Sequence, residues 1–147
     1  MAEVEFPLYS EKVARVLEGS ADLASGLGGF LGIEHVEVGP GYLHARVAVR
    51  EELKTPFGNL HGGVLSALCD HVLGTVCYPV IPRGAWAATT EFKLNLLAPV
   101  TQGVLDARAQ IVSLTKRTAV VRIDVENVGR LVCAAQGTVL VMAPKAS

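Results

Sequence analysis

The sequence predicts an α+β fold in which one long apolar helix is wrapped by a six-stranded antiparallel sheet. Residues 62–76 form an apolar run of helical length, which Pro79 and Pro82 bring to an end. Six other segments read as strands, and most of them alternate apolar and polar residues. Short connections favour antiparallel neighbours, and a sheet with one apolar face needs a cover that only this helix can supply.

The N-terminal part is expected to be a helical extension, residues 1–29, of a single domain that spans residues 1–147. Ser10 can cap a short helix that carries Glu11 in its first turn. Gly26, Gly28 and Gly29 are expected to end any helix that follows.

The strands follow from local patterns and turn signals. Gly39, Pro40 and Gly41 predict a turn between the first two strands. A turn at 115–117 and a hairpin loop at 127–129 separate the later ones. The last strand is apolar on both faces, which indicates a central or interface strand. The expected strands are 31–38, 42–49, 88–97, 105–111, 119–126 and 131–142.

Composition excludes some classes of partner. The formal net charge is -1, which gives no electrostatic reason to expect nucleic acid. Cys69, Cys77 and Cys133 show no metal-binding spacing, so we interpret them as reduced core thiols of a cytoplasmic protein. No metal is expected.

No targeting or membrane segment is expected either. The N-terminus is acidic and lacks the basic-then-apolar plan of a signal peptide. The one candidate span, 64–81, is marginal in length and is interrupted by Asp70, His71 and Pro79. We interpret it as a buried helix.

Asp70 is the most informative residue, because a carboxylate on an apolar helix is costly unless it is used or paired. On a helix it shares a face with mostly small residues, which leave room for another backbone or a ligand. We expect partial desolvation there, which suits a general base. A structural partner for the carboxylate is the alternative. The face comprises Gly63, Ser66, Ala67, Leu73, Gly74 and Cys77.

The helix start, His61-Gly62-Gly63, suits an anion, since glycines allow close approach and the first N–H groups of a helix are unpaired. An oxyanion formed from a carbonyl fits this description. A plain tight turn is the alternative, with His61 acting as a base or pinning the turn. His71 is interpreted as a core or interface histidine. Thr89 and Thr90 could hold a water, although threonine is also ordinary on a strand.

The run from Gly58 to Gly63, followed by Ala67-Leu68-Cys69-Asp70, resembles the hotdog-fold acyl-CoA thioesterases, and most of all their PaaI-like branch of the phenylacetic-acid-pathway type. The resemblance spans roughly 30–141. It includes an acid nine residues after the motif histidine and the segment 91–99.

The resemblance implies dimers that join their sheets edge to edge, with active sites shared by two subunits. Gly62 would donate its N–H to the thioester carbonyl, and His61 would hold the turn. Asp70 of the other subunit would act as general base or nucleophile, and Thr89 would assist the water. Residues expected to bind substrate are Asn59, Gly63 and Thr90, with Lys116 and Arg117 meeting CoA phosphates or forming only a solvated turn.

One departure concerns a polar amide that many of these enzymes carry six residues before the motif histidine. This chain has Thr55 there. Whether the displaced Asn59 substitutes for it stays open.

The resulting expectation is a homo-oligomeric acyl-CoA thioesterase without metal or separate cofactor, coenzyme A being part of the substrate. The alternative is a non-catalytic acyl-CoA-binding hotdog protein, against which Asp70 argues. A hotdog dehydratase or hydratase is a third option that the Gly-Gly-to-Asp spacing disfavours. The acyl group and the choice between dimer and tetramer stay open.

Overall fold

The computed structural model describes residues 3–19 and 25–145, so residues 1–2 and 20–24 of the predicted N-terminal extension lie outside it. Its helices are α1 (Glu11–Gly19), α2 (Gly26–Leu31) and α3 (Gly62–Thr75), with short 3-10 helices η2 (Glu51–Leu53) and η3 (Tyr78–Val80). Its strands are β1 (Glu34–Gly39), β2 (Tyr42–Ala48), β3 (Trp86–Leu96), β4 (Val104–Leu114), β5 (Thr118–Asn127) and β6 (Arg130–Met142).

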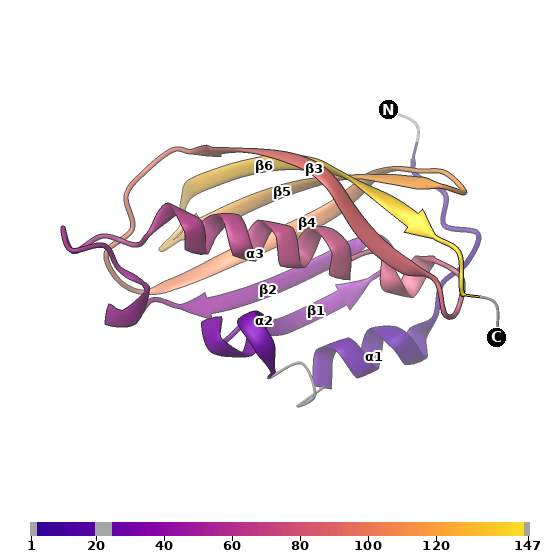
Figure 1. Cartoon of the computed structure of the whole chain (residues 1–147), viewed down its shortest axis with the longest axis horizontal. Coiled ribbons are helices and arrows are strands. Elements are labelled where there is room, and N and C mark those ends of the chain that lie inside the picture. The colour runs from indigo at the N-terminus through magenta and orange to yellow at the C-terminus, as the bar shows by residue number, and fades with distance from the viewer. Residues whose placement is uncertain (1–2, 20–24, 146–147) are drawn as a thin grey trace.

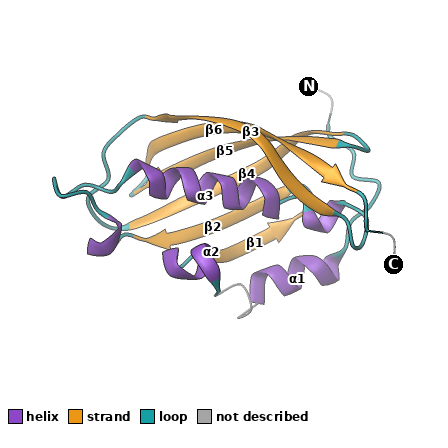
Figure 2. Cartoon of the chain, viewed as in Figure 1, coloured by secondary structure: helices purple, strands orange, loops and turns teal. Residues whose placement is uncertain are grey.

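The strands form one antiparallel sheet in the order β1-β2-β4-β5-β6-β3. α3 lies across one face of this sheet, and α1 and α2 lie beside β1 (Figure 1). Figure 2 shows the same arrangement by element type, with a single layer of strands behind the long helix. The predicted α+β architecture, a long helix against a six-stranded antiparallel sheet, is confirmed.

The inner face of the sheet is the face that alternation predicted. Every second residue of 105–111 in β4 and of 119–125 in β5 is at most 1% exposed and belongs to one core cluster with α3. Burying such side chains is the main favourable term in folding, at roughly 25 cal/mol per Å² of apolar surface. The residues concerned are Leu105, Ala107, Ala109, Ile111, Ala119, Val121, Ile123 and Val125.

β6 is internal to the sheet, between β5 and β3, as its apolar character on both faces predicted.

The position of β3 was not predicted, because short connections suggested that consecutive strands are neighbours. Instead residues 97–103, which connect β3 to β4, run from beside β6 to beside the end of β2. Leu97 N–H donates to Val132 O (2.8 Å), Leu60 N–H donates to Val100 O (2.7 Å), and Val49 N–H donates to Gly103 O (2.9 Å). β3 is therefore an edge strand.

The helix α1 begins as expected, with Val13 N–H donating to the Ser10 hydroxyl (3.2 Å). The expectation that Gly26, Gly28 and Gly29 end a helix is wrong, since all three lie inside α2.

The glycine that ends α2 is Gly32, which has φ 71°. Gly32 N–H donates to Gly29 O and Ile33 N–H donates to Gly28 O, the hydrogen bonds of a left-handed C-terminal cap. Arg50 also holds α2, because it donates to Leu31 O (3.1 Å) and its guanidinium lies 5.1 Å from the centre of the Phe30 ring. These distant contacts carry no local signal, and they explain why the first strand starts at Glu34 and not at Leu31.

The segment Gly62–Val80 is long and apolar enough to cross a membrane, with a mean hydropathy of 1.3. However, 56% of it is buried inside the protein, as the core helix of the sheet. Cys69, Cys77 and Cys133 are buried and free, as expected of core thiols.

Candidate active site

The start of α3 is shaped by His61, which caps the helix through its side chain. Gly63 N–H donates to His61 Nδ1 (2.8 Å), and Val64 N–H donates to His61 O (2.9 Å). A Cβ at Gly63 would stand 2.9 Å from His61 Nδ1, so the ring needs a glycine here. Of the alternatives for His61, this geometry favours the residue that pins the turn, since its Nδ1 already accepts a hydrogen bond.

The N–H of Gly62 differs in its hydrogen bonding from the N–H groups of the next two residues. Among the described residues it has no hydrogen-bond acceptor, whereas the next two N–H groups both bond to His61. It lies in the first turn of α3, where the helix dipole favours negative charge. An unpaired donor at this position can bind a carbonyl oxygen that gains negative charge.

The loop before α3 brings Thr55 and Asn59 together. Thr55 N–H donates to Asn59 O (2.7 Å), and the Thr55 hydroxyl lies 3.2 Å from Asn59 Oδ1. Asn59 also lines a hollow of about 320 Å³ beside Gly62, walled by Leu96 and the segment after it. An amide is thus present next to Gly62, although it comes from Asn59 and not from the position that Thr55 occupies.

A second hollow, of about 280 Å³, lies on the other side of the helix start. His61, Gly63 and Ala67 line it together with Phe30 of α2 and Lys54. No sequence pattern placed α2 in this region, because its position depends on the contacts with Arg50. The exposed apolar side chains of Leu96 and Leu97, 56% and 52% exposed, were likewise not singled out.

Asp70 is exposed in this chain, and the expectation that it is partly desolvated is not met within one subunit. The reason is that the sheet covers only one side of α3, where Val64, Leu68 and Val72 are buried. The face predicted to be lined by small residues is the uncovered side. Gly63 is exposed there, and Ser66, Ala67 and Gly74 are half-buried, whereas Leu73 and Cys77 belong to the core. We call Gly63, Ser66, Ala67, Asp70 and Gly74 the open stripe of α3.

The two most important predicted residues are far apart within one chain. Gly62 and Asp70 are separated by eight positions of α3, which corresponds to roughly 12 Å along the helix axis. One carbonyl cannot contact both groups at that distance.

β3 runs antiparallel to α3, as two close approaches between them show. A Cβ placed at Gly74 would lie 4.0 Å from Ala87 O, and one placed at Gly62 would lie 2.8 Å from Leu96 Cδ1. Thr89 is two residues along β3 from the first contact, and Asp70 is one helical turn before Gly74. The half-buried Thr89 is therefore on the Asp70 side of this interface.

Thr90 is the extra residue of a β-bulge, since the register with β6 shifts between Thr89 and Glu91. Its hydroxyl donates to Thr138 O (3.1 Å), so the Thr90 side chain is exposed but already bonded.

Lys116 and Arg117 are exposed in the turn between β4 and β5. Arg117 O accepts from Val141 N–H (2.7 Å), and Val141 pairs with Ala87 of β3. The turn therefore lies toward the C-terminal end of α3, away from Gly62. The structure thus gathers Asn59, His61, Gly62 and Gly63 at one end of α3, and separates them from Asp70, Thr89, Lys116 and Arg117.

His71 is bonded to a residue that the sequence did not single out. Its Nε2 lies 2.9 Å from His35 Nε2, and His35 Nδ1 lies 2.9 Å from Leu17 O. Burial, together with the charge of His35, lowers the pKa of His71 to about 4. His71, interpreted as a core or interface histidine, is half-buried and links α3 to β1 and α1.

Comparison with known families gives a match over residues 57–134, to the thioesterase superfamily. Among curated proteins, the chain is 31% identical over 117 residues to the 1,4-dihydroxy-2-naphthoyl-CoA hydrolase of Listeria monocytogenes. That alignment covers 79% of this chain and 95% of the relative.

Solved structures of proteins from the same family have a similar fold. A thioesterase of Haemophilus influenzae superposes with a TM-score of 0.84 at 26% identity, covering 92% of this chain and 94% of the other. A phenylacetic acid degradation-related protein of Ralstonia eutropha superposes with a TM-score of 0.78 at 26% identity, covering 88% and 98%.

Proposed function

Since the chain belongs to the thioesterase superfamily and has its hotdog fold, we propose that this thioester hydrolase cleaves an acyl-CoA to a free carboxylic acid and coenzyme A. The observation that carries the proposal is the open side of α3. Near it lie the Gly62 N–H, which bonds to no described residue, and the Asp70 carboxylate, on an otherwise apolar helix. A named relative that hydrolyses an acyl-CoA supports the choice of coenzyme A ester.

In the proposed reaction, Gly62 N–H donates a hydrogen bond to the thioester oxygen. Asp70 removes a proton from a water while the water oxygen attacks the carbonyl carbon. The carbon–sulfur bond of the tetrahedral intermediate then breaks, and the sulfur takes the proton held by Asp70 and leaves as the thiol of coenzyme A. An oxyanion donor of this kind contributes roughly 10²–10³ in rate. Direct attack by the carboxylate is the other route by which Asp70 could act, with water then hydrolysing the anhydride.

The site is proposed to be completed by a second copy of the chain. The roughly 12 Å between Gly62 and Asp70 along α3 argues that the two groups act on one carbonyl only when they come from different subunits. The edge strand β3 offers the route, because two such edges related by a two-fold axis pair antiparallel. That pairing sets the Gly62 end of one subunit toward the Asp70 side of its partner and would cover the open stripe.

The other predicted residues have supporting roles in this proposal. His61 holds the turn that aims the Gly62 N–H, and Thr89 orients the water. Asn59, Gly63 and Thr90 contact the substrate, and Lys116 and Arg117 meet the phosphates of coenzyme A. We propose that no metal or separate cofactor takes part, and that the protein works in the cytoplasm, in keeping with its free thiols.

Asp70→Asn tests the assignment, because the amide keeps the size of the side chain but cannot take the proton. We expect turnover to fall by at least about 10²-fold, as for loss of a general base. The assay is release of free thiol from a panel of short-, medium- and long-chain, phenylacetyl and hydroxybenzoyl-CoA esters. Asp124→Asn, the same change at an exposed residue on the outer face of β5, is the matched control and should be fully active.

Near-normal turnover in Asp70→Asn would contradict the mechanism. Tight binding of acyl-CoA by the unaltered protein without hydrolysis of any ester would instead indicate a non-catalytic acyl-CoA-binding protein.

A further inference from the structure

A larger hollow lies at the opposite end of α3 from Gly62. Its volume is about 660 Å³, within the range of roughly 300–1,000 Å³ typical of small-molecule sites. α3, with its 14 residues, separates the hollow from Gly62 by roughly 21 Å. None of the residues assigned above to the thioesterase site lines it.

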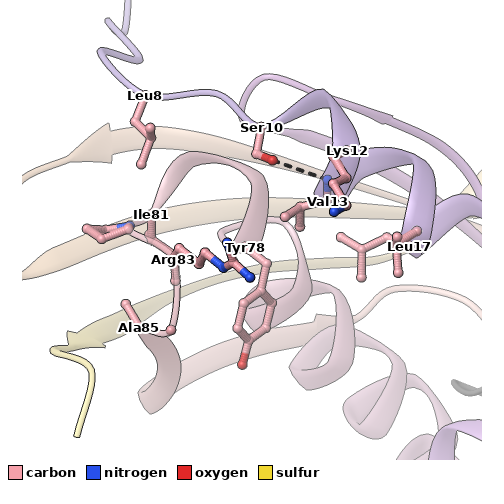
Figure 3. A pocket seen from close by; sticks show the side chains of 12 residues that line it. Leu8, Ser10, Lys12, Val13, Leu17, Tyr78, Ile81, Arg83 and Ala85 are labelled. Carbon is pink, nitrogen blue, oxygen red and sulfur yellow. Dashed lines mark hydrogen bonds between the residues drawn. The ribbon is translucent and has the colours of Figure 1, made fainter. Parts of the chain in front are cut away.

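The walls come from α1, from η3 and from the turn that precedes β3 (Figure 3). α1 presents Val13 and Leu17, and Tyr78 and Ile81 face them from the other wall. The two walls are joined near Ser10, whose N–H donates to Pro79 O (2.7 Å). The hollow is therefore held by the backbone and is mostly apolar.

Two apolar side chains at the hollow are exposed. Val16 is 57% exposed and Leu8 is 42% exposed, and both line it. Apolar surface gathered around a concavity commonly marks a binding site.

Two cations border the same hollow. Lys12 of α1 and Arg83 of the turn before β3 line it, and neither forms an ion pair with a described residue. The carboxylates of α1 are engaged elsewhere, since Glu11 pairs with Arg15 (3.5 Å) and Glu18 accepts from Val38 N–H (2.7 Å). The hollow thus combines an apolar body with a positive border that no described carboxylate neutralises.

We propose that this hollow binds a medium- or long-chain alkyl carboxylate. The alkyl chain lies between α1 and the Tyr78–Ile81 wall, and the carboxylate is neutralised by Lys12 and Arg83. A ligand with one apolar end and one anionic end satisfies both features, which an uncharged or a fully polar molecule does not. The proposal concerns a second site and does not rest on the proposed thioesterase mechanism.

The experiment is a calorimetric titration of the full-length protein with decanoate and with decan-1-ol, which has the same chain without the charge. Val16→Glu places a carboxylate in the hollow from an exposed position and should weaken decanoate binding by at least tenfold, which corresponds to about 1.4 kcal/mol. Val36→Glu, the same change at a 42% exposed valine of β1 outside the hollow, is the control and should bind normally. A Lys12→Gln/Arg83→Gln double variant should lose its preference for decanoate over decan-1-ol.

Weaker binding in Val16→Glu with unchanged thioester hydrolysis and unchanged sedimentation supports the second site. Decanoate binding that survives Val16→Glu would place the acid elsewhere, such as at the start of α3, and would overturn the proposal. So would the absence of saturable binding, or equal affinity of the unaltered protein for decanoate and decan-1-ol. A change of oligomeric state in Val16→Glu would identify the hollow as a contact between copies, which also overturns it.

Discussion

Gly62 acts through its backbone in this account, so the informative substitutions are those that remove or keep its N–H. Gly62→Pro removes the donor at a helix position that tolerates proline, because it is the first residue of α3. His61 before it is already extended, at φ -66° and ψ 131°, as a residue preceding proline must be. We expect kcat to fall by roughly 10²–10³, measured as thiol release.

Gly62→Ala is the matched control, because it adds a Cβ but keeps the N–H. That Cβ would come 2.8 Å from Leu96 Cδ1, the end of a side chain that is 56% exposed and can rotate away. The alanine variant should therefore stay close to full activity. Equal losses in both variants would show that bulk, and not the hydrogen bond, matters at Gly62.

His71 makes the stability of the fold depend on pH. Its pKa is lowered to about 4 by burial and by His35, below the value of 6.5 that it has when unfolded. As the pH falls through this interval, the unfolded chain binds a proton that the folded chain does not, so stability decreases. Below about pH 4 both states are protonated and the loss levels off.

At about pH 5 this effect amounts to roughly 2 kcal/mol relative to neutral pH. Urea unfolding at the two pH values measures it. His71→Asn should lose less stability on acidification than the unaltered protein, because it removes the group whose pKa is lowered. An unchanged pH dependence in His71→Asn would show that other groups cause it.

At the residue scale, the sequence predicted which residues mark the site better than it predicted their exposure and contacts. The small residues around Asp70 did indicate an open face of α3, and His61 did mark the helix start. The exposure of Asp70 could not be predicted, because it depends on which side of α3 the sheet covers. The His35–His71 contact joins residues on different elements, and no local pattern encodes it.

Among the elements, the packing of β6 against α3 and β3 depends on one glycine. A Cβ at Gly137 would stand 2.5 Å from Phe92 Cβ, 2.6 Å from Glu91 O and 3.0 Å from Leu73 Cδ2. Because a backbone oxygen and a Cβ cannot move aside cheaply, we expect Gly137→Ala to destabilise the protein by roughly 1–3 kcal/mol. Urea unfolding at neutral pH gives the value.

Gly39→Ala is the control for this substitution, since nothing lies within 4 Å of the position and its φ is not in the left-handed region. It should change the free energy of unfolding little. A Gly137→Ala variant as stable as Gly39→Ala would contradict the tight contact between β6, β3 and α3.

Elements with a strong local period were the ones that the sequence could predict. The alternation in β4 and β5 and the apolar run of α3 gave both their type and their buried side. α2 was not predicted, because the four glycines in and after it suggest a loop. Arg50 and the cap at Gly32 nevertheless stabilise a helix there. The position of β3 at the edge of the sheet was not predicted either, because it depends on the path of residues 97–103 past the start of α3.

At the scale of the whole molecule, the proposed site requires the association of two chains. One chain leaves the β3 edge unpaired by any described strand and leaves the open stripe of α3 uncovered. Each subunit would therefore supply Gly62 to one site and Asp70 to the other.

The most direct measurement of this shared site is subunit complementation. Gly62→Pro and Asp70→Asn proteins, each inactive alone, are unfolded together, refolded and assayed for thiol release. A hybrid dimer then has one site with both residues intact, and since about half of randomly formed dimers are hybrids, about a quarter of the full activity should return. If the mixture stays as inactive as its parents although hybrids form, Gly62 and Asp70 do not act on one thioester from different subunits, and the account is wrong.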